Sequence, residues 1–140
     1  MAHEIPVKVR FSETDALGHI SNISYFIYLE EARTEFFAEL GFGRDIKNWK
    51  IILASASCDF VSQGYYNQKL VVRTAVSKIG NSSFQVVHEI NDAESGELIA
   101  KGQASGVHFN FETQKSEPLP EANRQQLEKH LVKEASHHGN

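Results

Sequence analysis

The stretch Glu13-Thr-Asp-Ala-Leu-Gly-His-Ile-Ser-Asn-Ile-Ser-Tyr-Phe-Ile-Tyr-Leu-Glu-Glu-Ala-Arg33 decides the fold. It opens as a polar turn with Asp15 and Gly18, in which the glycine supplies backbone freedom. Ser21 and Asn22 are residue types that commonly start helices. A carboxylate placed a few residues before a helix N-terminus faces unpaired backbone N–H groups and the positive end of the helix dipole. Such an arrangement can hold an acid ionised and can also stabilise an oxyanion.

The helix is expected to run from about Ser21 to Leu40, and Gly41 supplies a natural stop. Its apolar residues recur at three- and four-residue spacing and form one face, consisting of Tyr25, Tyr28, Leu29, Ala32, Phe36 and Leu40. Glu31 and Arg33 are interpreted as an ion pair on the helix surface. A long helix so rich in large aromatic residues is expected to pack against a sheet that curls around it.

Five segments have strand character, and turn residues typical of hairpins join the later ones. The first alternates through Ile5, Val7, Val9 and Phe11, and the others are Ile51–Val61, Leu70–Ile79, Ser83–Ile90 and Leu98–Phe109. In the second, one face is predicted to hold Ile52, Ala54, Ala56, Cys58 and Phe60. In the last, a face of small residues lets another element come close, namely Ala100, Gly102, Ala104 and Gly106.

The class that follows is α+β, with an antiparallel five-stranded sheet wrapped round one long central helix. After Pro118-Leu-Pro120, a polar surface helix is expected over 121–135 and a frayed tail over 136–140. The whole chain, 1–140, is predicted to be one domain, with 121–140 as its peripheral part.

Composition narrows the function classes. Hydrophobic residues make up 41% of the chain, charged residues 23%, and the net charge is -4. No basic run points to nucleic acid, and no apolar run approaches the roughly 18 residues of a membrane span. The single cysteine, Cys58, excludes an internal disulfide. A soluble cytoplasmic protein without membrane insertion or a nucleic-acid partner is expected.

Candidates for chemistry gather in the turn. Asp15 is either a turn-capping residue or a catalytic acid, and His19 is either a satisfied turn histidine or a general base or substrate contact. The sequence contains no Gly-x-Ser-x-Gly elbow, Walker loop or paired metal-ligand motif, so no metal site is predicted.

A resemblance adds to these observations. Val9-Arg-Phe-Ser-Glu-Thr-Asp15, Gly18-His-Ile-Ser-Asn22 and Glu31-Ala-Arg33 with the preceding tyrosines are similar to the signature of hot-dog-fold acyl-CoA thioesterases of the 4-hydroxybenzoyl-CoA thioesterase-like group. Weaker motifs follow in the same order to about Pro120. The chain departs from the group at Phe60–Gln68, where the group often carries a proline and a Gly-Asp pair. This departure concerns the acyl pocket, not the fold.

The resemblance implies a hydrolase that cleaves an acyl-CoA to a free acid and CoA. Asp15 would match the catalytic aspartate, acting as nucleophile or general base, and the backbone N–H of Asn22 would match the oxyanion-hole donor. It also implies a homodimer joined at sheet edges or a homotetramer, with active sites at the subunit boundary. No cofactor is expected, because CoA is part of the substrate.

The predicted substrate-binding residues lie in two places. Gly18, Ser21 and Tyr25 belong to the turn and the helix start, whereas Lys78, Ser82 and Ser83 flank the turn at Gly80. Two other functions remain open: a non-catalytic acyl-thioester binding protein, and a hot-dog dehydratase that acts on acyl carrier protein.

Overall fold

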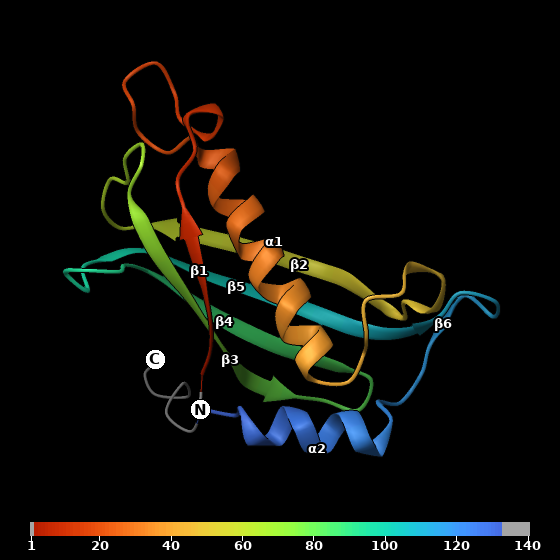
Figure 1. Ribbon diagram of the computed structural model, residues 1–140. Coiled ribbons are helices and arrows are strands. Elements are labelled where there is room, and N and C mark those ends of the chain that lie inside the picture. The colour runs from red at the N-terminus through yellow and green to blue at the C-terminus, as the bar shows by residue number, and fades with distance from the viewer. Residues whose placement is uncertain (1, 133–140) are drawn as a thin grey trace.

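The computed structural model describes residues 2–132 and confirms the expected α+β architecture (Figure 1). Five strands form an antiparallel sheet in the order β1-β3-β4-β5-β2. They are β1 (His3–Lys8), β2 (Ile51–Phe60), β3 (Lys69–Ile79), β4 (Ser83–Asp92) and β5 (Leu98–Asn110). A two-residue strand, β6 (Lys115–Ser116), pairs with β5. Helix α1 (Asn22–Glu39) lies across one face of the sheet, and α2 (Glu121–Lys129) lies beside β3. Single 3-10 turns occur at Phe11–Glu13 and Ile46–Asn48.

Helix α1 begins and ends as predicted. Ser21 is its N-cap, Leu40 its C-cap, and Gly41 follows with φ +94°, a left-handed conformation that glycine adopts without strain. All six residues of the predicted apolar face are buried. Removing this face from water is the main reason that the helix stays on the sheet.

The small-residue face of β5 allows α1 to approach closely. A Cβ atom at Gly102 would lie 2.6 Å from Cδ1 of Leu29, so no other residue fits there without displacement. The prediction of a close contact along this face is confirmed. The same row of the sheet contains His88 on β4 and Cys58 on β2, which lie opposite Gly102 on either side.

Two details of the predicted strands are wrong. Phe11 is not on a buried strand face, because β1 ends at Lys8 and the chain turns into a 3-10 helix, which leaves Phe11 75% exposed. In β2, the register against β5 shifts between Leu53 and Ser55. This bulge gives Leu53, rather than Ile52, the same face as Ala56.

The chain after β5 returns to the sheet. Leu127 of α2 is fully buried, and beyond α2 the N–H of Val132 donates to the carbonyl of Val76 at 2.8 Å. Helix α2 ends at Lys129, earlier than predicted. The predicted tail, 136–140, lies outside the described residues, so the domain limits stay a prediction. Between residues 2 and 132, no helix has the length and apolar character needed to cross a bilayer.

Candidate active site

The turn before α1 holds Asp15 by its own backbone. Oδ1 of Asp15 accepts hydrogen bonds from the N–H groups of Leu17 at 2.8 Å and His19 at 3.1 Å. The N–H of Asp15 donates to the carbonyl of His19 at 2.8 Å, and Gly18 has φ +80°. Asp15 therefore caps the turn. It is also exposed, and its second oxygen, Oδ2, accepts no hydrogen bond from the described residues.

The loop after β2 holds this turn in place by backbone hydrogen bonds. The N–H of Ile20 donates to the carbonyl of Gly64 at 2.9 Å, and the N–H of Tyr66 donates to the carbonyl of Gly18 at 2.9 Å. The rings of His19 and Tyr65 meet edge to face with centroids 5.1 Å apart. A Cβ atom at Gly64 would collide with Cδ1 of Ile20, which explains why a glycine stands there. The segment in which the sequence departs from the thioesterase pattern thus positions the Asp15 turn.

Glu13 links the turn to the start of α1 by hydrogen bonds. The sequence interpretation did not predict this role. Its carbonyl accepts hydrogen bonds from the N–H of Ser21 at 3.0 Å and the hydroxyl of Ser24 at 2.9 Å. Its buried carboxylate accepts from the Tyr28 hydroxyl at 2.8 Å and from the Arg10 backbone and guanidinium at 2.6–2.9 Å. Burial alone would raise the pKa of Glu13, but these donors outweigh it and lower the pKa. The three-residue spacing between Arg10 and Glu13 is the feature of the sequence from which this pairing could have been predicted.

The N-terminus of α1 carries free donors. Ser21 makes no capping hydrogen bond to the helix, because its hydroxyl pairs with that of Ser24 at 2.9 Å. The N–H groups of Asn22 and Ile23 have no acceptor among the described residues. Both residues are exposed, so an anionic oxygen can reach these donors from outside.

The predicted substrate-binding residues fall into two separate groups. Tyr25 joins the turn group: it is buried, its ring packs 5.1 Å from that of Phe60, and burial raises its pKa. Lys78, Ser82 and Ser83 surround the β3–β4 turn, where Arg124 of α2 donates to backbone carbonyls. This is the end of the sheet away from the Asp15 turn (Figure 1), so one chain does not bring the two groups together.

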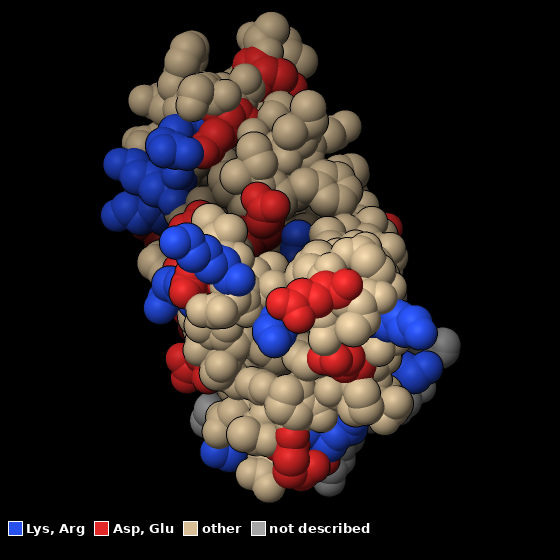
Figure 2. Space-filling view, turned by 90° about the vertical axis from the view of Figure 1, so that its right-hand side faces the viewer, with Lys and Arg blue, Asp and Glu red and all other residues tan. Residues whose placement is uncertain are grey.

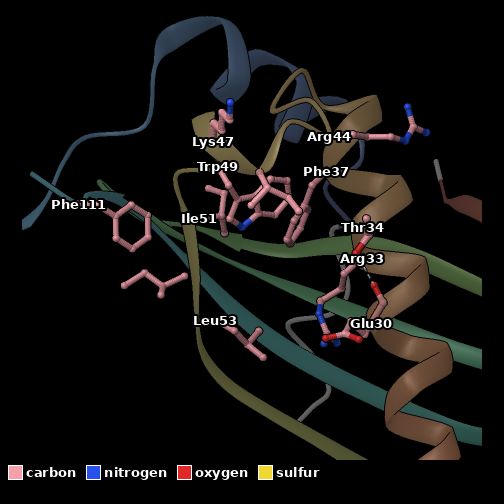
Figure 3. Close-up of a pocket in the computed structure, with 12 residues that line it drawn as sticks. Glu30, Arg33, Thr34, Phe37, Arg44, Lys47, Trp49, Ile51, Leu53 and Phe111 are labelled. Carbon is pink, nitrogen blue, oxygen red and sulfur yellow. Dashed lines mark hydrogen bonds between the residues drawn. The ribbon is translucent and has the colours of Figure 1, made fainter.

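A groove of about 770 Å³ opens between the C-terminal half of α1 and the start of β2; we call it the α1–β2 groove. Figure 2 shows this side of the molecule hollowed near its middle, with acidic and basic side chains around the hollow. Most of its lining is apolar, from Phe37, Ile46, Trp49, Ile51, Ile52, Leu53 and Phe111. Its polar side chains are Glu30, Arg33, Thr34, Arg44 and Lys47 (Figure 3). Asp15 lies outside it.

Arg33 contradicts the predicted ion pair with Glu31. Residues two apart point to different sides of a helix, and Glu31 is exposed whereas Arg33 is only 7% exposed. No described residue forms a hydrogen bond or ion pair with the Arg33 guanidinium. Its burial lowers the pKa of Arg33, and Glu30 counters part of that change.

Within residues 2–132, no three His, Cys, Asp or Glu side chains come together in a way that could hold a metal ion. The chain therefore offers a carboxylate oxygen and helix N–H donors at the start of α1, and a largely apolar groove along the C-terminal half of the same helix.

Comparison with known proteins shows the family to which the chain belongs. The family model of the thioesterase-like superfamily matches residues 9–127. The chain belongs to this superfamily. The solved structure of a predicted thioesterase from Bacillus stearothermophilus superposes with a TM-score of 0.88 at 33% identity, covering 94% of this chain and 98% of that one. The predicted hot-dog fold and the predicted class of enzyme, a thioesterase, are thereby confirmed.

Two further proteins are similar to this chain. YsmA of Bacillus subtilis is 34% identical over 110 residues, which is 79% of this chain and 74% of YsmA. A gentisyl-coenzyme A thioesterase superposes with a TM-score of 0.78 at 26% identity, covering 89% of this chain and 99% of that one.

Proposed function

We propose that this thioesterase-like protein hydrolyses the thioester of an acyl-CoA to the free acid and CoA. One observation carries the proposal: among the described residues, one carboxylate oxygen of Asp15 has no hydrogen-bond partner, and it precedes a helix whose first N–H groups likewise have no acceptor there. The similarity to a gentisyl-coenzyme A thioesterase supports CoA as the thiol half of the substrate. No cofactor takes part in this reaction.

Asp15 is proposed as the nucleophile or the general base. As nucleophile, its oxygen adds to the thioester carbonyl, the CoA thiolate leaves, and water then cleaves the acyl–Asp15 anhydride. As base, it takes a proton from the water that attacks the same carbon. In both routes the carbonyl oxygen becomes negative, and the N–H of Asn22 at the positive end of α1 stabilises it. His19, in the same turn, is proposed as a further polar contact.

A second copy of the chain is proposed to complete the site, because Asp15 lies outside the groove. The start of α1 lies by the end of β2, where Tyr25 meets Phe60, and its C-terminal half lies by the start of β2, where the rings of Phe37 and Trp49 are 6.1 Å apart. In an antiparallel pair of β2 strands, the start of one strand lies beside the end of the other. The partner's helix start would then adjoin the α1–β2 groove.

The remaining assignments follow from this proposal. Gly18, Ser21 and Tyr25 shape the reacting end of the site. Lys78, Ser82 and Ser83 hold CoA only if a further copy brings them near, as a homotetramer would. A cytoplasmic location is proposed on the absence of any possible internal disulfide.

The test measures free thiol released from a panel of aryl-, short- and long-chain acyl-CoAs. Asp15→Asn retains a side-chain oxygen that can cap the turn but removes the nucleophile or base, so kcat should fall about 10²- to 10⁴-fold. Asp92→Asn is the matched control, because Asp92 also caps a turn, through the N–H groups of Glu94 and Ser95 at 2.8 Å.

Unchanged turnover in Asp15→Asn would remove the assignment. Tight binding of acyl-CoA without thiol release would instead identify a binding protein. Hydration of a crotonyl thioester on acyl carrier protein would identify a dehydratase.

A further inference from the structure

Arg33 is a buried cation that forms no hydrogen bond or ion pair with another residue between 2 and 132, although the nearby carboxylate of Glu30 offsets part of the effect of burial. Only 7% of Arg33 is exposed to solvent, and no described residue lies close enough to form an ion pair with it. An unpaired buried charge costs several kcal/mol, so a protein retains one where an anion completes it. The neighbouring His88 offers no compensation, because burial and the charge of Arg33 keep its imidazole neutral.

The groove around Arg33 has the shape and surface of a ligand site. Its volume of about 770 Å³ falls within the range of small-molecule pockets, roughly 300–1,000 Å³. Phe37, Trp49 and Phe111 supply aromatic faces, and Figure 3 shows Arg33 at one end of the space that these side chains border. A ligand with an apolar body and one charged end would fit this surface.

The charges on the groove favour an anion. Three of its side chains are cationic and one, Glu30, is anionic. Arg44 is already paired with Glu35, and Lys47 is exposed to solvent. Arg33 is therefore the cation that is both desolvated and unpaired, and a guanidinium matches a carboxylate in two parallel hydrogen bonds.

We propose that the α1–β2 groove binds the acyl part of the substrate and that Arg33 pairs with a carboxylate at the far end of that acyl group. The substrate class is then a CoA monothioester of a dicarboxylic acid with an apolar, preferably aromatic, body. This inference rests on the proposed function. Within one chain, Arg33 is about 16 Å along the helix axis from Asn22, eleven residues at 1.5 Å each. The reacting end consequently comes from the partner subunit's Asp15.

The experiment compares two thioesters of equal size, 4-carboxybenzoyl-CoA and 4-methylbenzoyl-CoA. The wild-type protein should prefer the carboxylated substrate in kcat/KM by about 30-fold or more, the value expected for a buried charge pair of roughly 2 kcal/mol. Arg33→Met should abolish this preference while leaving hydrolysis of the methyl compound within about threefold. Arg73→Met, which removes a cation paired with Glu4, should preserve the preference.

Equal kcat/KM values for the two substrates in the wild type would overturn the proposal. So would equal slowing of both substrates in Arg33→Met, since a merely structural arginine acts on both alike. Binding of the uncleavable thioethers 4-carboxyphenacyl-CoA and 4-methylphenacyl-CoA, measured by calorimetry, gives a second readout. A carboxylate preference in binding without any thiol release would support Arg33 and reject the proposed function.

Discussion

One of the histidines on the inner face of the sheet, His88, makes the stability of the fold depend on pH. His88 is 2% exposed, its Nδ1 lies 2.9 Å from the hydroxyl of Thr74, and its Nε2 has no hydrogen-bond partner among the described residues. Burial lowers the pKa of His88 to about 3, and the positive charge of Arg33 adds to the effect. The imidazole is therefore neutral in the folded protein throughout the physiological range.

We expect acid to destabilise the fold through this residue. Between about pH 6.5 and pH 4.5, His88 is protonated in the unfolded chain but not in the folded one, so the free energy of unfolding falls as the pH falls. In His88→Gln this proton difference is absent, and the fall over that interval should be shallower. Urea unfolding at pH 7, 6 and 5 measures both slopes. Identical slopes in the two proteins would show that His88 is accessible to protons in the folded state.

At the scale of elements, the side chains of α1 and β5 are complementary in size. The helix presents Leu29 where β5 presents Gly102, and the row continues through small residues that leave room for the large helix side chains. At the other end of β5, a Cβ atom at Gly106 would instead meet side chains of the neighbouring strands, lying 3.1 Å from both Ile51 of β2 and Phe84 of β4. Large residues on one element and small residues on the other give close packing without cavities.

Gly102→Val should lower the free energy of unfolding by about 1–3 kcal/mol, because an added Cβ meets Leu29 at 2.6 Å and the buried leucine has to move. Gln103→Val is the matched control, since its side chain is exposed on the other face of the same strand. Chemical denaturation measures both variants. A Gly102→Val protein as stable as the control would show that α1 adjusts freely on the sheet.

At the scale of the whole molecule, the two edges of the sheet differ. Edge strand β1 carries Pro6 and Lys8, which discourage pairing with another chain. Edge strand β2 has ten residues, mostly exposed, without proline or lysine. An exposed edge of this kind is usually paired with another strand or covered. The difference between the two edges therefore supports a dimer formed through β2.

Ser55→Lys, in the middle of β2, should convert the proposed dimer to a monomer, since two lysines would meet across the paired edges. Thioester hydrolysis should be lost with it if the partner supplies Asp15. Sedimentation velocity gives the mass, and Ser116→Lys, exposed on β6, is the control. A Ser55→Lys protein that remains dimeric would exclude β2 as the interface.

Much of this protein follows from neighbours along the chain. The apolar spacing from Tyr25 to Leu40 and the glycine after it predict α1, and the hairpin turns predict the order of the later strands. The position of Asp15 before a helix start is likewise local information. Periodicity and turn chemistry depend on residues a few positions apart, so the sequence alone determines them.

The tertiary structure decided what depends on distant partners. The bulge in β2 that turns Leu53 to the face of Ala56 arises from its pairing with β5, and the Glu13 network arises from the approach of Tyr28. Arg33 has an ordinary charge pattern for a helix surface, yet the packing of α1 on the sheet leaves it only 7% exposed and close to His88. Burial is a property of the packed chain, and a guanidinium changes from a solvated charge to an anion site only when water is removed from around it.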